Sequence, residues 1–324
     1  MATYKEIFGK QVKQVSTDLT DSEREGQIWF NTAAGVFKTA LNVGAWSSGG
    51  NLGTAKYNLM SANGAPSTAA LAFGGGGPSA LSSTEEYGGT SWTAGGALPT
   101  GKFAGAGAGT QTAGLSFGGR PPSSGATTTE EYDGSSWTGG GAMPVAKMGL
   151  AGCGIQTAAL AFGGSPPTRN TTEEYDGSSW TVGGTLSVAF EDAAGAGTQT
   201  AGLKFGGRST PTQTTEKYNG SSWTTSGLMN TGRGYLAGAG IQTAALGYGG
   251  KTLPSTYQTS TEDFNGSTWT TSSATMAVTR IQFGGTGATS SGALAFGGEN
   301  AGAGSIATTE EYDKAITTKT LTSS

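Results

Sequence analysis

The chain has no histidine among its 324 residues, a single cysteine and only 12% charged residues. The lack of histidine excludes Ser-His-Asp and Cys-His catalysis, imidazole general-base chemistry and nearly every catalytic zinc or copper site. We therefore expect no metal and no cofactor. The enzymatic route that remains open is a carboxylate pair of the kind that hydrolyses glycosides.

The single cysteine and the lack of long apolar runs bear on disulfide formation, membrane insertion and secretion. Cys153 lies in an apolar, glycine-rich segment, so we expect a small buried thiol rather than a nucleophile, and no disulfide framework can form. No stretch of about 18 apolar residues could span a bilayer. The sequence from Met1 to Glu6 lacks the apolar run of a secretory signal. We expect a soluble protein that is made in a cytoplasm and does not insert into a membrane.

The net charge is −4, and the lysines and arginines are scattered singly. Binding to a nucleic-acid backbone depends on a basic stripe or patch, which this sequence does not contain. We therefore expect no nucleic-acid partner.

The chain is rich in glycine, with 59 residues, and it is repetitive. An aromatic residue followed by two glycines begins at Phe73, Phe117, Phe162, Phe205, Tyr248 and Phe296. After each comes a glutamate, a second residue that is usually acidic, and an aromatic residue, at 85–87, 130–132, 173–175, 216–218, 262–264 and 310–312. Five copies are followed by a tryptophan, namely Trp92, Trp137, Trp180, Trp223 and Trp269. The tryptophans recur every 43 to 46 residues, a period typical of solenoids, propellers and arrays.

Each repeat is predicted to contain four short strands. In the third copy these are 150–155, 158–162, 171–176 and 179–182, joined in up-and-down order by turns. Helical periodicity is absent past residue 25. Four strands per unit in a radial array is the plan of a β-propeller blade.

The residues of these repeats resemble the kelch-repeat propellers. The resemblance is carried by Phe162-Gly163-Gly164, by Tyr175-Asp176, by Trp137 and by the Met-Pro-Val-Ala-Lys run at 143–147. It covers roughly residues 44 to 324 and implies an all-β, six-bladed kelch-like propeller. It implies little about function, because propellers host many unrelated activities.

The sixth copy lacks its tryptophan, and Trp46 supplies a matching one near the start of the chain. Trp46 precedes Phe73 by 27 residues, the same spacing as from Trp269 to Phe296. We therefore predict that residues 45 to 51 form the outer strand of the last blade and close the ring, which would leave no strand edge at the join.

Residues 1 to 43 do not fit the repeat and are predicted to form an attachment segment. Residues 26–38 alternate apolar and polar residues around a turn at Gly35, which predicts a β-hairpin. The run Glu-Gly-Gln-Ile-Trp-Phe-Asn-Thr resembles a module near the start of tailed-phage structural proteins. Its combination with Gly/Thr-rich kelch-like repeats resembles virion proteins of marine tailed phages. This resemblance implies a virion location and attachment to other virion proteins, with homo-oligomers in the particle as an option; the candidate attachment residues are Tyr4, Ile28, Trp29, Phe30 and Phe37.

The repeated acids and aromatic residues are expected to be structural. A catalytic pair is singular, whereas these pairs recur in every copy, so we assign no catalytic residue. The first acid is glutamate in all six copies and is expected to accept a hydrogen bond within its blade, while the second varies and is expected to face solvent. The tryptophans and tyrosines are expected to fill the space between neighbouring sheets, except that Trp29 is expected to dock onto another protein.

Differences between the repeats are concentrated in two sets of loops, which we expect to open on one face. The candidate ligand-binding residues are Arg120, Arg169, Arg208, Arg233, Lys251 and Tyr257. A ring of surface cations is expected from Lys56, Lys102, Lys147, Arg233 and Arg280, with Phe190-Glu191-Asp192 interrupting the series. The alternative is that these charges pair with neighbouring glutamates. The opposite face, made of short turns, is expected to be bland.

Three functions follow from this reading. The first is a non-enzymatic virion protein that binds a host-surface glycan or protein through the loop-rich face. The second is an architectural head or tail protein that binds only other virion proteins. The third is a glycan-cleaving enzyme.

Overall fold

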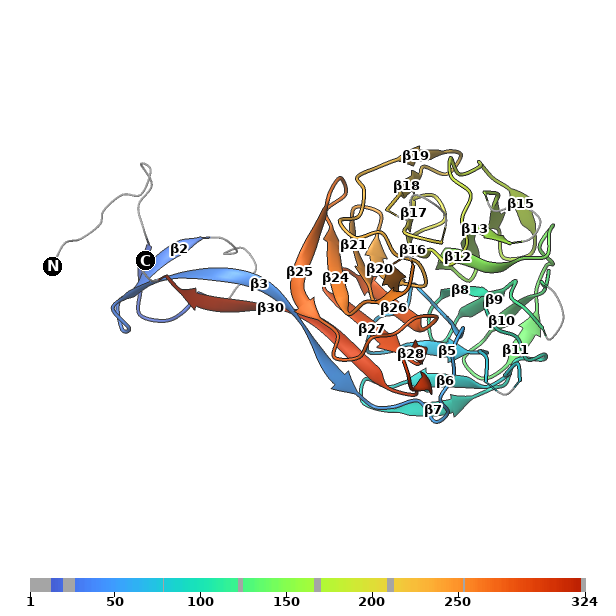
Figure 1. Cartoon of the computed structure of the whole chain (residues 1–324), viewed down its shortest axis with the longest axis horizontal. Coiled ribbons are helices and arrows are strands. Elements are labelled where there is room, and N and C mark those ends of the chain that lie inside the picture. The colour runs from blue at the N-terminus through green and yellow to red at the C-terminus, as the bar shows by residue number, and fades with distance from the viewer. Residues whose placement is uncertain are drawn as a thin grey trace. The chain divides into compact units, whose positions relative to one another are not determined.

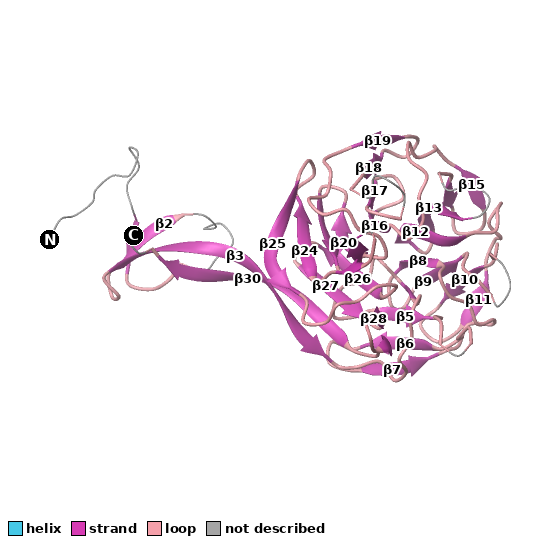
Figure 2. Cartoon of the chain, viewed as in Figure 1, coloured by secondary structure: helices cyan, strands magenta, loops and turns pink. Residues whose placement is uncertain are grey.

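The computed structural model describes residues 13–19, 27–77, 79–121, 125–165, 170–208, 213–252 and 254–321. The regular secondary structure of these ranges consists of β-strands, and no helix is assigned within them (Figure 2). The chain forms two compact units, one of residues 1–45 with 313–324 and a larger one of residues 46–312.

The larger unit contains five four-stranded antiparallel sheets, one for each of the first five repeats (Figure 1). The first is β4 (Met60–Ser61), β5 (Leu71–Phe73), β6 (Thr84–Tyr87) and β7 (Trp92–Gly95). The second is β8 (Ala106–Gly109), β9 (Gly114–Phe117), β10 (Thr129–Tyr132) and β11 (Trp137–Gly139). The third is β12 (Met148–Ile155), β13 (Ala158–Ser165), β14 (Thr172–Tyr175) and β15 (Trp180–Val182). The fourth is β16 (Ala194–Gly197), β17 (Gly202–Phe205), β18 (Thr215–Tyr218) and β19 (Trp223–Thr225). The fifth is β20 (Ala237–Ile241), β21 (Ala244–Tyr248), β24 (Ser260–Phe264) and β25 (Trp269–Thr275).

The sixth repeat departs from this plan. Its strands β26 (Gly284–Thr289), β27 (Gly292–Phe296) and β30 (Thr309–Thr320) belong to a six-stranded sheet with β3 (Val36–Gly49), β2 (Ile28–Asn31) and β1 (Lys13–Val15). The order in that sheet is β1-β2-β3-β30-β27-β26. The expectation of six separate four-stranded sheets is therefore corrected to five. The strands of the sixth repeat share a larger sheet, because β3 and β30, with 14 and 12 residues, continue beyond the repeat and also pair within the smaller unit. Two short hairpins, β22 (Lys251–Thr252) with β23 (Thr256–Tyr257) and β28 (Glu299–Asn300) with β29 (Gly304–Ser305), complete the larger unit.

The tryptophans pack between neighbouring sheets, as the repeat predicted. Trp180 stacks on Tyr175 of its own repeat at 4.9 Å and on Phe117 of the preceding repeat at 5.1 Å. Its indole Nε1 donates a hydrogen bond to Thr129 Oγ1 at 2.9 Å. The same bond to the preceding repeat recurs at 2.8 or 2.9 Å from Trp137 to Thr84, Trp223 to Thr172 and Trp269 to Thr215. Trp46 and Trp92 donate to Thr261 and Thr309 at 2.9 Å. Each aromatic pair adds about 0.5–1.5 kcal/mol beyond the area it buries.

At glycine positions the inner strands of neighbouring sheets approach each other too closely for a side chain. A Cβ at Gly195 of β16 would lie 2.7 Å from the carbonyl oxygen of Gly152 in the neighbouring β12. The diglycines have a different role, because Gly163 and Gly164 adopt φ angles of 68° and 83° at the end of the second strand, as expected.

The smaller unit is built around the predicted hairpin. Asn31 pairs with Val36 across a turn in which Gly35 has a φ of 69°. Asp18 accepts hydrogen bonds from Asn31 and Lys38 at 2.7 Å and from Thr318 at 3.0 Å. The Lys38 hydrogen bond is the main cause of a pKa for Asp18 below its usual value.

The structure corrects the role expected for Trp29. Its side chain is fully buried, so it cannot present its indole to another protein without a rearrangement. Phe30 and Phe37 pack edge to face at 5.2 Å and are half-buried, while Ile28 is exposed. Tyr4 lies outside the described residues.

Candidate functional site

The expected ring of surface cations is wrong. Five basic side chains in the loops before the first strands are buried in ion pairs with the first glutamate of their repeat. The pairs are Lys56–Glu85 at 2.9 Å, Lys102–Glu130 at 2.5 Å, Lys147–Glu173 at 2.5 Å, Arg233–Glu262 at 3.1 Å and Arg280–Glu310 at 2.6 Å. Arg233 is therefore not available as a ligand-binding residue. Burial lowers the pKa of Lys102 and Lys147, and the paired glutamates oppose that shift.

In repeat 4 the cation near the buried first glutamate comes from a strand rather than from the loop. Phe190 occupies the loop position of the cation, and Lys204 of β17 brings an ammonium group to 4.7 Å from the Phe190 ring. Lys204 also donates to Thr214 Oγ1 at 2.6 Å, and burial lowers its pKa to about 8. Glu216 accepts hydrogen bonds from the backbone and hydroxyl of Ser187 at 2.8 Å. The buried cation has moved from the loop to a strand, so the repeat keeps an internal positive charge beside its glutamate.

The second acids connect neighbouring repeats rather than facing solvent, which corrects the expectation for them. Tyr132 donates a hydrogen bond to Glu86 at 2.6 Å and Tyr175 to Glu131 at 2.5 Å. The corresponding bonds from Tyr218 and Tyr87 are made to Glu174 and Glu311. Burial, followed by the glutamate contact, raises the pKa of the four tyrosines to about 12. These repeated carboxylates stabilise the packing of the sheets.

One residue per repeat surrounds an opening on the loop-rich face, and all six adopt left-handed backbone conformations with φ between 49° and 63°. We call these residues the mouth ring: Asn58, Ala104, Gly149, Asp192, Tyr235 and Gln282. Main-chain hydrogen bonds of 2.6 to 2.9 Å link Asn58 to Gln282, Ala104 to Asn58, Gly149 to Ala104, Asp192 to Gly149 and Tyr235 to Asp192. A left-handed conformation at a residue other than glycine costs about 1–3 kcal/mol and is retained where the surroundings enforce it. The ring therefore holds six residue positions, five of which carry a side chain, in fixed geometry.

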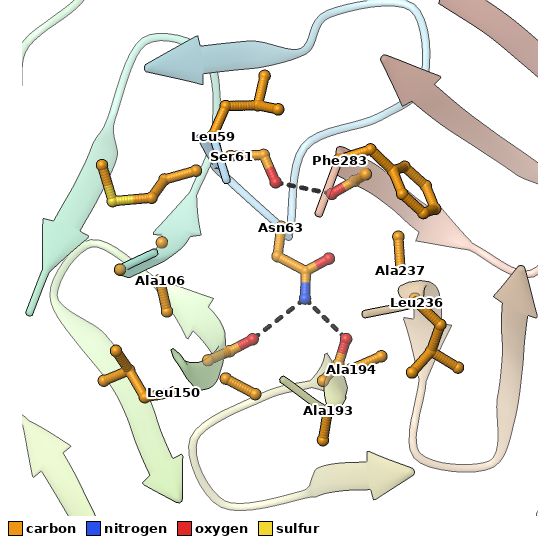
Figure 3. Close-up of a pocket in the computed structure, with 18 residues that line it drawn as sticks. Leu59, Ser61, Asn63, Ala106, Leu150, Ala193, Ala194, Leu236, Ala237 and Phe283 are labelled. Atoms are coloured by element: carbon orange, nitrogen blue, oxygen red, sulfur yellow. Dashed lines mark hydrogen bonds between the residues drawn. The ribbon is translucent and has the colours of Figure 1, made fainter. Parts of the chain in front are cut away.

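A cavity of about 110 Å³ lies within the mouth ring and a second of the same volume lies beneath it. The two share the lining residues Leu59, Gly105, Leu150, Ala193, Leu236 and Phe283. At their base the Asn63 amide donates to the carbonyl oxygens of Gly152 at 3.1 Å and Gly195 at 2.7 Å (Figure 3). The other amide atom, Oδ1, is buried and meets no donor in the described ranges. Thr286 holds this segment in place through bonds to the carbonyl oxygens of Ala62 and Ala65 at 2.9 and 2.6 Å.

A charged and aromatic cluster adjoins the mouth ring at repeats 4 and 5. We call it the Tyr235 cluster: Glu191, Asp192, Arg208, Tyr235, Lys251 and Tyr257. The Arg208 guanidinium lies 5.1 Å from the centre of the Tyr235 ring, and the Lys251 ammonium lies 5.2 Å from the same centre and 5.9 Å from that of Tyr257. Arg208 also pairs with Glu191 at 3.3 Å and Asp192 at 3.4 Å, with 42% of its side chain exposed.

The acids of the cluster have unusual surroundings. Burial, reinforced by the neighbouring Glu191, raises the pKa of Asp192 to about 6, and Arg208 opposes that shift. Burial also raises the pKa of Tyr235 to about 12, with Asp192 adding to the effect. The cluster therefore presents hydrogen-bond donors and acceptors side by side with little net charge.

The structure brings together three of the six binding residues predicted from the sequence, namely Arg208, Lys251 and Tyr257. Arg120 belongs to repeat 2, where its guanidinium lies 5.8 Å from the centre of the Phe103 ring. Arg169 lies outside the described residues. Sequence reasoning missed Asn58, Asp192, Tyr235 and Gln282 as a set. The available signal was the position two residues after the loop cation, or after Phe190 in repeat 4, which holds a different residue in every repeat.

The opposite face was expected to lack binding features, but it contains a cavity with exposed apolar residues. A cavity of about 310 Å³ opens there, lined partly by Ile155 and Ile241, which are 54% and 47% exposed. The Gln-Thr turns of this face are structural, since Gln156 Nε2 donates to the carbonyl oxygens of Gly114 and Tyr132 at 3.0 and 2.7 Å. Gln111, Gln199 and Gln242 make equivalent pairs of bonds.

Two kinds of feature are absent from the described ranges. They contain no group of three or more His, Cys, Asp or Glu side chains that could hold a metal ion. Within the same ranges, no helix has the length and apolar character needed to cross a membrane.

No family model and no curated protein matches this sequence. A solved structure of YjhT matches the fold with a TM-score of 0.66. The chain has a β-propeller-like fold. The match has 14% sequence identity and covers 83% of this chain and 99% of YjhT, so the likeness is one of fold alone.

Proposed function

We propose that the chain is a structural protein of a tailed-phage virion that displays a six-bladed, kelch-like propeller on the particle and binds a host-surface component through the loop-rich face. The sequence resemblance of residues 1–43 to phage structural proteins and the kelch-like repeats support this setting. The smaller unit is the attachment segment in this proposal, with exposed Ile28 as its contact.

The proposed sixth blade consists of β26, β27, β30 and the end of β3. Trp46 of β3 packs against Tyr312 at 5.2 Å and Tyr248 at 5.1 Å, as the tryptophans of the other repeats pack against their neighbours. Trp92 of repeat 1 bonds Thr309 of repeat 6, in the pattern that joins every other pair of consecutive repeats. These contacts support a closed ring that residues near both ends of the chain complete.

The observation that carries the binding proposal is the Tyr235 cluster. Arg208 and Lys251 come from the loop regions of different repeats and both approach the ring of Tyr235 beside the mouth ring. Tyr257, which pairs with Lys251 in the hairpin β22–β23, adds a second ring to the same ammonium group. Variable loops on a rigid scaffold are the usual location of recognition. The repeated glutamates are held in ion pairs and tyrosine contacts, which supports binding without catalysis.

A purely architectural role is the second candidate. The exposed Ile155 and Ile241 beside a cavity on the opposite face favour contact with another virion protein there. Exposed apolar patches of this kind mark protein contacts more often than bare surface.

Adhesion of the full-length chain to susceptible host cells tests the binding proposal. We expect the purified protein to adhere, and Arg208→Ala with Lys251→Ala to reduce adhesion at least ~10-fold, since a lost contact to a charged group weakens binding by about 1.5–3 kcal/mol. Lys13→Ala with Lys319→Ala makes the same charge change in the smaller unit and serves as the control. Equal adhesion of both double variants would place the binding surface elsewhere, and no adhesion at all would favour the architectural role.

A further inference from the structure

We infer that the opening within the mouth ring is a subsite for a single neutral sugar residue. The inference rests on the proposed binding function and names its ligand class. The subsite, here called the mouth pocket, has three layers: a polar rim, a wall formed largely by main-chain atoms at glycines and the Asn63 amide at its base.

The size of the mouth pocket limits the ligand. The two cavities hold about 110 Å³ each, and pockets for drug-sized ligands measure about 300–1,000 Å³. A ligand that enters must therefore be as small as one ring. Gly105, Gly152 and Gly195 present only main-chain atoms to the cavity above Asn63. The side chains of Leu59, Leu150 and Leu236 point away from its centre (Figure 3), so the wall offers main-chain polar groups to the hydroxyls of a sugar ring.

The rim offers groups that match hydroxyls. The side-chain amides of Asn58 and Gln282 each carry donors and an acceptor, and neither makes a side-chain hydrogen bond to the described residues. Asp192 supplies acceptor oxygens and Tyr235 a phenol on the same rim. Sugar hydroxyls both donate and accept, so a mixed rim of this kind serves them better than it serves a purely acidic or basic group.

The base of the pocket supplies an acceptor that lacks a donor. Both amide hydrogens of Asn63 point to backbone carbonyls, which fixes the orientation of the side chain and leaves Oδ1 buried with no donor in the described ranges. A buried acceptor without a partner costs free energy, and a ligand hydroxyl or a bridging water would remove that cost. This atom points to a ligand with O–H or N–H groups rather than to an apolar one.

The charges around the rim favour a neutral ligand. Glu191 and Asp192 are paired with Arg208, so its guanidinium is already neutralised. An anionic sugar in the pocket would face the Asp192 carboxylate, which is mostly ionised at pH 7 because its raised pKa is still about 6. Arg208, which pairs with Asp192 at the rim, would oppose a cationic ligand.

The test uses the full-length chain and the free sugars glucose, galactose, mannose and N-acetylglucosamine, with glucuronate as the charged probe. Saturation-transfer NMR and calorimetry measure binding. We expect at least one neutral sugar to bind with a dissociation constant on the order of millimolar, as suits a ligand of about 12–15 non-hydrogen atoms. Glucuronate is expected to bind more weakly.

Two substitutions test the rim. Asn58→Ala and Gln282→Ala remove the amides, and the ring accepts alanine in this conformation because Ala104 already has a φ of 55°. We expect the double variant to lose ~5-fold or more in affinity, since each hydrogen bond contributes about 2- to 10-fold. Thr200→Ala, on the opposite face, is the matched control and is expected to bind like the unaltered chain.

Absence of binding by all four neutral sugars would overturn the inference, as would unchanged affinity in the double variant or tighter binding of glucuronate. These results are distinct from failure of the proposed function. Adhesion that depends on Arg208 and Lys251 without sugar binding refutes only the mouth pocket, whereas sugar binding without adhesion supports the pocket and refutes the host-surface role.

Discussion

The phenol of Tyr87 donates a hydrogen bond to the carboxylate of Glu311, which lies 224 positions later in the chain. The same contact joins Tyr132 to Glu86 and Tyr175 to Glu131, each between consecutive repeats. Tyr87 belongs to the first repeat and Glu311 to the last, so the contact that joins neighbours elsewhere here joins the two ends of the array.

Replacing Tyr87 with phenylalanine tests that junction. The substitution removes the donor and leaves the Glu311 carboxylate without it, so we expect a loss of about 1–3 kcal/mol in the free energy of unfolding. Urea denaturation measures the loss, and Tyr132→Phe provides a matched change between repeats 1 and 2. A loss for Tyr132→Phe with none for Tyr87→Phe would show that the first and last repeats are not joined in solution.

The arrangement of repeat 4 can be transferred to repeat 3. Lys147→Phe leaves the Glu173 carboxylate buried without its cation, and breaking a buried pair in this way costs about 3–5 kcal/mol. Adding Ala161→Lys places a lysine where repeat 4 has Lys204, so we expect the double variant to regain part of that loss. Thermal and urea unfolding compare the two proteins. A double variant less stable than the single one would mean that the two arrangements are not interchangeable.

Asp192 should make stability fall as the pH rises. Its folded pKa of about 6 exceeds its reference value of 3.8, so between these pH values the folded chain holds more protons than the unfolded one. We expect Asp192→Asn to match the parent below about pH 4 and to exceed it by on the order of 1–3 kcal/mol above about pH 6.5. Urea unfolding across that range measures the difference.

Asp133 provides a control in which the pH dependence of stability runs in the opposite direction. Hydrogen bonds from Ser136 and Ser135 lower its pKa to about 2, so its stabilising effect is present above the reference value of 3.8 and is lost as the pH falls towards 2. Asp133→Asn should therefore lose stability at neutral pH and match the parent near pH 2. The same pH trend for Asp133→Asn and Asp192→Asn would contradict both assignments.

Close approach of the inner strands predicts a strong effect of one methyl group. The Cβ of Gly195→Ala would meet the carbonyl oxygen of Gly152 at 2.7 Å, a backbone atom that cannot turn aside, so we expect a cost of about 1–3 kcal/mol. Gly139→Ala is the control, because no atom lies within 4 Å of its added carbon and its φ is not positive. The control should change stability by less than about 0.5 kcal/mol. Equal stability of the two variants, measured by thermal unfolding, would mean that the inner strands have more room than the structure gives them.

The repeat made much of the fold predictable. The spacing of the aromatic residues and diglycines predicted four-strand units, and the phase of the tryptophans predicted their burial between sheets. The six-stranded sheet was not predicted, because nothing in the repeat shows that β3 and β30 continue past it. Residues 45–49 nevertheless fall in β3 beside β30, which agrees with the spacing of Trp46.

The binding face was predictable only in part. Arg208, Lys251 and Tyr257 were found because they vary in predicted loops. Arg233 and the other loop cations were misjudged, because charge and phase do not tell whether a loop side chain turns inward to a buried glutamate. A signal was present: a cation recurs once per repeat alongside the first glutamate, and in repeat 4 Phe190 and Lys204 depart from the pattern together.

The links between members of the mouth ring use only main-chain atoms, so the fold does not depend on which side chains are placed there. Asparagine, alanine, glycine, aspartate, tyrosine and glutamine already occupy the six positions of one ring. A lineage of such proteins can therefore change what this face recognises one position at a time, while the scaffold that holds those positions stays the same.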